Sequence, residues 1–513
     1  ATFLEKLGLN VQDMNTNNIK IFGQKGGMLP QLSGAERTDD IKEIPIKVIG
    51  QGKSIEIQAY LNGPESWNYD ASSSTFQETK NLYTNQKCYF ITIGNSPGQR
   101  INLGNEISDN ANKTIQVFDD YQHVEDDSEN LLESGSIWLG PEIGANNQLQ
   151  YNFNFPNIVS NSPAKITLGI AAKSNLNTNT FQVSSNGTVL KNITISPVGS
   201  SYLSNAANYS ESNSTLINPE SNIPILINYN RPDYNAKAWP DFITVNAQRT
   251  LSFNQEPLYF RSIASVDDNA ISQFELSNWN NNVSVWDVTD LFNIQEIKVN
   301  NGAFKSKTNI LREFIAFQSP NLTPIAIGKI ENQNLHALEQ ADYLIITRKS
   351  LMSYAREIGE FHLQEEGLSY HVVDIEDIFN EFSSGNNDLT AVRNFVKMFY
   401  DRSSSQPETA PKYLLLFGNG NFDNRSLEEF LLPSYQSAKS FQTVETYVTD
   451  DYFGLLDDTE GDDVTNTSTQ LLDIAIGRIT VDNLEKASHS VEKIKRYYSQ
   501  SSFGSWRSQA AFM

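Results

Sequence analysis

The sequence contains a single cysteine, Cys88, among its 513 residues. One thiol can form neither an intrachain disulfide nor a Cys-x-x-Cys metal site, so neither holds this fold together. No run of about 18 apolar residues occurs, and the sequence therefore predicts no membrane-spanning helix. The first ten residues have neither a basic start nor a long apolar core. They do not match a signal peptide, and we expect the native protein to be longer.

Positive charge is also scarce. Lys and Arg number 38 against 61 Asp and Glu, which gives a formal charge of −23. This balance argues against nucleic acid as a partner, because binding to phosphates requires a basic surface. It fits an extracellular or surface-exposed protein, or one that handles cations. Hydrophobic residues make up 39% of the chain, enough for packed cores, and the length predicts roughly two to four domains.

Residues 1–335 are dominated by the patterns of β-strands. Alternating or β-branched segments are separated by turns, and helical patterns are few. Asn186-Gly187 lies between two such segments and predicts a type I′ hairpin turn. Residues 199–216, rich in Asn, Ser and Thr, are expected to form a loop. The predicted strands are 46–50, 89–94, 149–157, 165–173, 180–185, 188–195 and 242–248.

These strands predict sandwich-like, all-β modules. We place a boundary at the acidic run that begins at Glu125. This gives a β-rich domain over residues 1–125 and one or more sandwich-like domains over residues 126–335.

From residue 336 the pattern changes to alternating strands and helices, as in a doubly wound α/β domain over residues 336–513. Gly367 is expected to end the first helix, and Asp388 to cap the second. Ligands of such sheets gather at the carboxyl ends of the strands. The predicted strands are 341–348, 369–375, 412–418 and 473–479, and the predicted helices are 350–366, one that follows Asp388, and 484–498.

A glycine-containing loop, from Gly418 to Asp423, follows the third of these strands. It lacks the Lys-Ser/Thr of a Walker A loop and the third glycine of a dinucleotide-binding loop. A plain strand-to-turn connection explains its glycines as well as a ligand-binding role does.

The densest acidic segment spans residues 449–463 and includes Asp462 and Asp463. Hard oxygen ligands this close are able to bind Ca²⁺, although EF-hand spacing is absent. The Ca²⁺ candidates are Asp423, Asp451 and Asp457, and a solvated acidic turn is the simpler alternative. Asp450 has aromatic neighbours, and a half-buried carboxylate there could orient a catalytic histidine.

No cysteine–histidine pair in this sequence makes a convincing nucleophile and base. Cys88 lies in a strand pattern, where a free thiol is usually a small buried hydrophobe. His371 lies within a predicted strand and His489 on a predicted surface helix. The other histidines are His123, His336 and His362, and none has a partner at metal-ligand spacing.

Several long segments resemble the gingipain family of cysteine peptidases, in the order in which that family has them. The most specific is NEFSSG…DLTAVRNF within residues 378–402, since nothing generic requires it to recur. The other matching segments are 22–46, 63–70, 81–94, 238–251, 285–291, 332–347, 412–425, 447–461 and 473–498.

The resemblance implies N-terminal β domains followed by a caspase-like α/β peptidase domain. It points to the members that act as sortases of type IX secretion at the surface of Gram-negative bacteria, peripheral to the outer membrane. These remove the C-terminal secretion domain of cargo proteins through a thioester acyl-enzyme and transfer the cargo to a lipopolysaccharide or lipid acceptor. An outer-membrane β-barrel shuttle and other secretion components are the implied partners, and no cofactor is required beyond an optional structural Ca²⁺.

In the family, the nucleophilic Cys and the base His follow a strand that would begin here at Ala510. They are therefore expected beyond Met513, and the fragment alone is expected to be inactive. The resemblance places Asp450 at the position of the His-orienting acid. Asn419 replaces the Asp of the family's usual Gly-Asp-Gly. The alternative function is a non-catalytic docking or adhesion module at the outer membrane.

Overall fold

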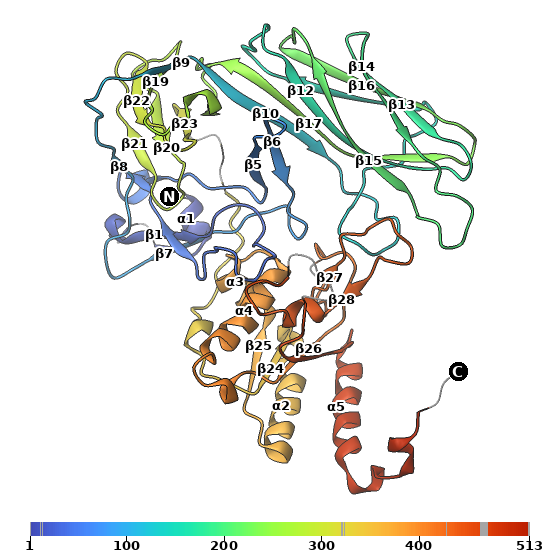
Figure 1. Ribbon diagram of the computed structural model, residues 1–513. Helices are drawn as coiled ribbons and strands as arrows, with labels where there is room; N and C mark the ends of the chain where they lie inside the picture. The colour runs from blue at the N-terminus through green and yellow to red at the C-terminus, as the bar shows by residue number, and fades with distance from the viewer. Residues whose placement is uncertain are drawn as a thin grey trace.

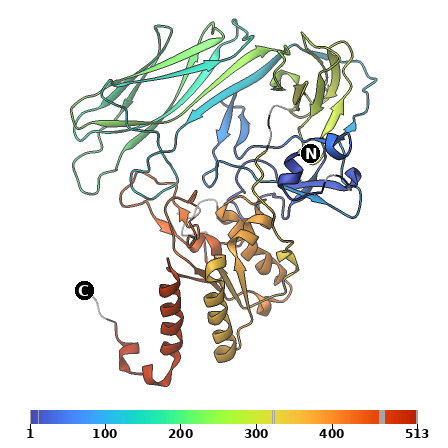
Figure 2. The same cartoon turned by 180° about the vertical axis from the view of Figure 1, so that it is seen from behind.

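The computed structural model describes residues 2–10, 12, 14–319, 322, 324–426, 428–461 and 470–510. The β-rich part and the α/β part form two layers, one above the other in the view of Figure 1 and in the reverse view of Figure 2. No helix among the described residues is long and apolar enough to cross a membrane.

A β-sandwich forms the centre of the β-rich part. One sheet has the order β10-β17-β12-β15 and the other β11-β16-β13-β14, and apolar side chains from both fill the space between them. Asn186 and Gly187 both have positive φ, which confirms the predicted hairpin turn between β13 and β14. The strands are β10 Val117–Glu125, β11 Gln148–Asn154, β12 Ala164–Lys173, β13 Asn179–Ser185, β14 Thr188–Ile195, β15 Asn208–Leu216, β16 Asn222–Asn230 and β17 Lys237–Thr250.

The prediction that residues 199–216 form a loop was wrong for β15. Asn208–Leu216 pairs antiparallel with β12 at the edge of its sheet. An edge strand tolerates polar side chains, and the hydrophobic pattern therefore gave no signal.

A second β unit combines segments from both sides of the sandwich sequence. Its five-stranded sheet has the order β18-β23-β20-β21-β8, and its three-stranded sheet the order β22-β19-β9. The strands are β8 Asn102–Leu103, β9 Lys113–Ile115, β18 Leu258–Arg261, β19 Ile271–Glu275, β20 Ser284–Asp287, β21 Gln295–Ile297, β22 Ala303–Lys307 and β23 Glu313–Phe317.

This pairing divides the chain differently from the predicted boundary at residue 125. β10 belongs to the sandwich through nine paired positions with β17. Residues 258–317 return to pair with β8 and β9, which precede the sandwich in sequence at residues 102–115. The sequence could not indicate this pairing, since the segments before and after the sandwich strands both show the pattern of β-strands.

The N-terminal residues form small elements beside this unit. β1 pairs with β2 and β7, and two hairpins join β3 to β4 and β5 to β6. The elements are α1 Thr2–Lys6, β1 Ile19–Gly23, β2 Lys42–Ile44, β3 Lys47–Ile49, β4 Glu56–Gln58, β5 Ser66–Asp70, β6 Thr75–Thr79 and β7 Phe90–Ile93.

The α/β part has a parallel sheet in the order β25-β24-β26-β29, which confirms the doubly wound prediction. Apolar residues of α3 and α4 cover one face, and those of α2 and α5 cover the other. A short ribbon, β27-β28, lies beside it. The elements are β24 Tyr343–Thr347, α2 Met352–Glu366, β25 Tyr370–Asp374, α3 Ile375–Phe382, α4 Leu389–Arg402, β26 Tyr413–Phe417, β27 Tyr435–Gln436, β28 Val448–Thr449, β29 Ala475–Ile479 and α5 Leu484–Tyr498.

Both predicted helix boundaries are confirmed. Gly367 ends α2 in the left-handed conformation at φ 73°. Asp388 caps α4 by accepting a hydrogen bond from the Thr390 N–H at 2.9 Å. Helix α3 was not predicted, although Asp374 caps it and its apolar residues recur at helical spacing. The strand expected from Ala510 falls largely on residues 511–513, which lie outside the described residues.

Residues 24–34, the N-terminal strap, lie along the α/β part, although the two segments are far apart in sequence. The Leu29 N–H donates to Asp388 Oδ2 at 2.8 Å, and Arg393 donates to the carbonyl of Pro30 at 3.1 Å. The N–H groups of Ser33 and Gly34 donate to the carbonyls of Glu460 and Asp458. The strap therefore ties the start of the chain to α4 and to the loop after β28.

Candidate functional site

The carboxyl ends of β24 and β26 mark the point where the strand order of the parallel sheet reverses. Ligands of doubly wound sheets bind in the crevice outside such a switch point. β24 ends at Thr347, whose hydroxyl donates to the Phe417 carbonyl at the end of β26 at 2.7 Å. The loops that follow these two strands are therefore the candidate site.

The loop after β26 is fixed by backbone and arginine contacts. Gly418 allows close packing, because a Cβ there would lie 2.9 Å from the Leu432 side chain. The Arg348 Nε–H donates to the Leu431 carbonyl at 2.7 Å, and its guanidinium also pairs with Glu376. These contacts fix the two ends of the loop, at Gly418 and at Leu431–Leu432, which favours the strand-to-turn interpretation for the glycines.

Arg478, on β29, connects this turn to the acidic segment. Its guanidinium makes a two-bond ion pair with Asp450, from Nε to Oδ2 at 2.8 Å and from Nη2 to Oδ1 at 2.7 Å. It also donates to the carbonyls of Asn419 at 3.1 Å, Leu432 at 3.3 Å and Pro433 at 2.8 Å. One arginine thus organises the edge of the sheet. A charged residue inside the parallel strand AIGRI was the sequence signal for it.

Asp450 is therefore held in one orientation. Its side chain is half-buried at 21% exposure, and each carboxylate oxygen accepts one bond from Arg478. A carboxylate offers about four acceptor positions, so each oxygen retains capacity for a further donor such as an imidazole N–H. The role of Asp450 in orienting a histidine stays a prediction.

The three Ca²⁺ candidates do not come together as one cluster. Asp423 accepts bonds from the backbone and side chain of Arg425, both at 3.1 Å. Asp457 accepts the Tyr400 hydroxyl at 3.0 Å, and Asp451 is exposed at the start of a 3-10 turn. Asp462 and Asp463 lie outside the described residues. Among the residues that the structure describes, one group has three metal-ligand side chains within 4.8 Å of one another: Asp40, His336 and Glu381.

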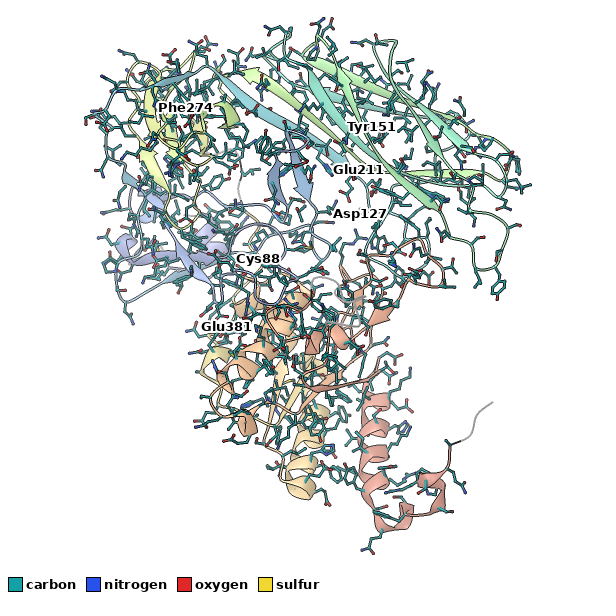
Figure 3. All side chains as sticks on the ribbon, viewed as in Figure 1. Cys88, Asp127, Tyr151, Glu211, Phe274 and Glu381 are labelled. Atoms are coloured by element: carbon teal, nitrogen blue, oxygen red, sulfur yellow. The ribbon has the colours of Figure 1, made fainter. Side chains whose placement is uncertain are left out.

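The β-sandwich contacts the same side of the α/β part. Trp138 stacks on Phe422 with ring centroids 5.7 Å apart, and the Arg425 guanidinium lies 4.2 Å from the Trp138 ring. Arg425 also pairs with Asp127 at 3.2 Å, and Asp127 lies just below the sandwich in Figure 3. The loop after β26 is thereby bound to the β-rich part.

A cavity of about 300 Å³ opens at this junction. Its carboxylates outnumber its cations, and Asp127 and Glu125 are close enough to hydrogen-bond to each other. Burial, followed by repulsion from Glu125, raises the pKa of Asp127 to about 6, and burial raises that of Asp241 to about 6. The charged lining residues are Glu78, Lys80, His123, Glu125, Asp127, Glu211, Asp241 and Arg425.

Cys88 lies just before β7 and is partly buried against the α/β part. Its carbonyl accepts the Ser384 hydroxyl at 2.9 Å, and burial raises the pKa of its thiol. In the part of the chain that the structure describes, no hydrogen bond joins this thiol to a histidine. His371 is in β25 and His489 is exposed on α5, as predicted.

The fold is similar to that of known proteins. Residues 336–513 match Peptidase family C25. This part of the chain is a family C25 peptidase domain, and family C25 is the gingipain family of cysteine peptidases. The predicted resemblance is thus confirmed, and the parallel sheet with its four flanking helices belongs to the C25 domain.

The whole chain, β-rich part included, is similar to a solved structure of dimeric latent PorU from Porphyromonas gingivalis. The TM-score is 0.81 at 26% identity, over 97% of this chain and 48% of that one. The chain thus spans about half the length of that PorU structure. A CBM36 carbohydrate-binding module, solved with calcium and xylotriose, matches 24% of this chain and 97% of its own at 19% identity, but its TM-score of 0.15 supports no inference. No curated protein matches the sequence.

Proposed function

We propose that this chain is the N-terminal part of a cell-surface cysteine endopeptidase that serves as the sortase of a type IX secretion system. The observation that carries the proposal is the similarity to PorU over 97% of the chain, combined with the C25 domain. The protein would lie peripheral to the outer membrane of a Gram-negative bacterium.

In this proposal a cysteine beyond Met513, deprotonated by a histidine, attacks the peptide carbonyl before the C-terminal secretion domain of a cargo protein. The peptide bond breaks, and the new amine leaves with the proton that the histidine returns. A thioester acyl-enzyme remains. An amine of a surface lipopolysaccharide or lipid then attacks the thioester and takes over the cargo, whereas attack by water gives simple hydrolysis.

Asp450 would support this chemistry by orienting the histidine. Its two bonds from Arg478 fix the carboxylate, so that an imidazole would meet it in one position. A structural Ca²⁺ is not required by any of these steps. Cargo proteins and a PorV-like outer-membrane β-barrel shuttle are the proposed partners.

The proposal is tested on the full native protein in a secreting strain. Changing the downstream cysteine to alanine should abolish cargo maturation, while Cys88→Ala, the matched control, should leave it unchanged. A native coding sequence without a histidine and a cysteine after Met513 would overturn the proposal. Loss of maturation in Cys88→Ala alone would contradict the site assignment.

A non-catalytic docking or adhesion module is the second candidate. The observation that favours it is the absence of a cysteine–histidine pair among the described residues. Four of the five histidines bond to carboxylates or to a backbone carbonyl, and none of these bonds is to the Cys88 thiol. Binding of this chain to an isolated β-barrel shuttle, with cargo maturation intact when the chain is deleted, would support docking alone.

A further inference from the structure

Three side chains of metal-ligand type meet where the N-terminal β elements contact the C25 domain. Asp40 lies in the segment between β1 and β2, His336 in a 3-10 turn before β24, and Glu381 near the end of α3. One ligand atom from each lies within 4.8 Å of the other two. Figure 3 shows Glu381 in the upper part of the C25 domain, below the N-terminal β elements.

The Glu381 side chain is held in place by hydrogen bonds that need no metal ion. It is 6% exposed, its Oε2 accepts the Leu335 N–H at 2.7 Å, and its Oε1 accepts the His336 N–H at 2.9 Å. Backbone donors leave such a carboxylate little freedom. Oε2 also accepts a hydrogen bond from Gln333 Nε2 at 3.3 Å, and Oε1 faces the imidazole of His336.

His336 is oriented through Nδ1 and through the face of its ring. Nδ1 lies 2.5 Å from Glu381 Oε1, and the ring stacks on Phe382 with centroids 4.6 Å apart. Nε2 is buried and faces Asp39, whose Oδ2 lies 3.4 Å away. A metal-binding histidine commonly directs its second nitrogen at a carboxylate in this way, which fixes the tautomer and strengthens the ligand.

We propose that Asp40, His336 and Glu381 bind a transition-metal dication such as Zn²⁺, with Asp39 as the positioning carboxylate behind the imidazole. Two carboxylates and a neutral imidazole balance the charge of a dication, and binding releases the Nδ1 proton if one is present. The mixed nitrogen and oxygen set favours Zn²⁺ over Ca²⁺ and Mg²⁺, which prefer oxygen alone. The ion would join the segment after β1 to α3.

The competing interpretation is a protonated His336 that bridges two carboxylates without an ion. The two interpretations differ in a spectroscopic readout. Co²⁺ in a four-coordinate site with a histidine ligand absorbs strongly in the visible range, whereas hydrated Co²⁺ absorbs weakly.

The experiment titrates Co²⁺, then Zn²⁺, into the chelator-treated 513-residue chain at neutral pH. We expect one visible band that saturates at one Co²⁺ per chain and is displaced by Zn²⁺. His336→Ala should abolish the band, and Asp39→Asn should weaken affinity by roughly 10–100-fold. His371→Ala is the matched control and should bind as the wild type does, since His371 bonds to a backbone carbonyl.

Asp40→Asn keeps the test decisive if His336→Ala fails to fold, because Asp40 is exposed and its loss should not disturb packing. Absence of a saturable band in the folded wild-type chain would overturn the proposal, as would unchanged Co²⁺ affinity in Asp40→Asn. Loss of the band in His371→Ala alone would place the metal elsewhere and also overturn it.

Discussion

At the scale of single residues, Arg478 joins Asp450 to the loop after β26 at the carboxyl edge of the C25 sheet. It makes five hydrogen bonds, two to Asp450 and three to carbonyls of the loop after β26. Its side chain is 10% exposed, so these bonds are mostly shielded from water. Without the Arg478 side chain, the Asp450 carboxylate and three loop carbonyls lose the donor that they share.

Arg478→Ala should therefore destabilise the protein by about 2–4 kcal/mol, measured by urea unfolding. Arg496→Ala, at an exposed position on α5, is the control and should change stability by less than about 0.5 kcal/mol. An unfolding midpoint for Arg478→Ala equal to that of the control would show that these five bonds do not contribute to stability.

At the scale of elements, the cap of α4 also serves the N-terminal strap. Asp388 is 2% exposed and accepts the N–H groups of both Thr390 and Leu29. Its loss leaves two donors unsatisfied, one of them from a segment 359 residues away in sequence.

Asp388→Ala is expected to cost about 2–3 kcal/mol, because a cap and a buried acceptor are lost together. Asn483→Ala is the matched control, since Asn483 caps the exposed start of α5 by accepting the Lys486 N–H at 2.9 Å. Its cost should be about 1 kcal/mol. Equal losses for the two variants would mean that the bond to Leu29 contributes nothing.

Sequence patterns predicted the helices and strands of the C25 domain better than the contacts between their side chains. Apolar periodicity and end signals such as Gly367 identified α2, α4 and α5, since both are local. The pairing of Asp450 with Arg478 and of Asp127 with Arg425 depends on how distant segments meet, which no local pattern encodes. The strand β15 was missed because its polar edge position needs no apolar face.

At the scale of the whole molecule, the junction between sandwich and C25 domain should respond to pH. The folded-state pKa of Asp127, about 6, lies above its ordinary value of 3.8. A raised carboxyl pKa adds stability that is complete below the ordinary pKa and is lost as pH rises through about 6. Asp241 acts in the same direction. The charges facing Asp127 are those of Lys80, Glu125 and Arg425.

Asp127→Asn resembles the protonated side chain. It should make Tm less dependent on pH between the ordinary pKa of 3.8 and the folded-state pKa of about 6. Part of the dependence should remain through Asp241. Asp126→Asn is the control, since Asp126 is the exposed neighbour and should follow the wild-type curve. Identical curves for Asp127→Asn and wild type would exclude Asp127 as the titrating group.

The N-terminal strap has a consequence for how the protein is made. Its bonds to Phe382, Asp388 and Arg393 join residues that are 358 to 363 positions apart. During synthesis the strap is made long before α4 and cannot form these bonds until α4 has been made. The chain between them must then close as one long loop, which is slow. A C25 domain cut out at residue 336 would therefore leave Asp388 and Arg393 without the backbone groups that the beginning of the chain supplies.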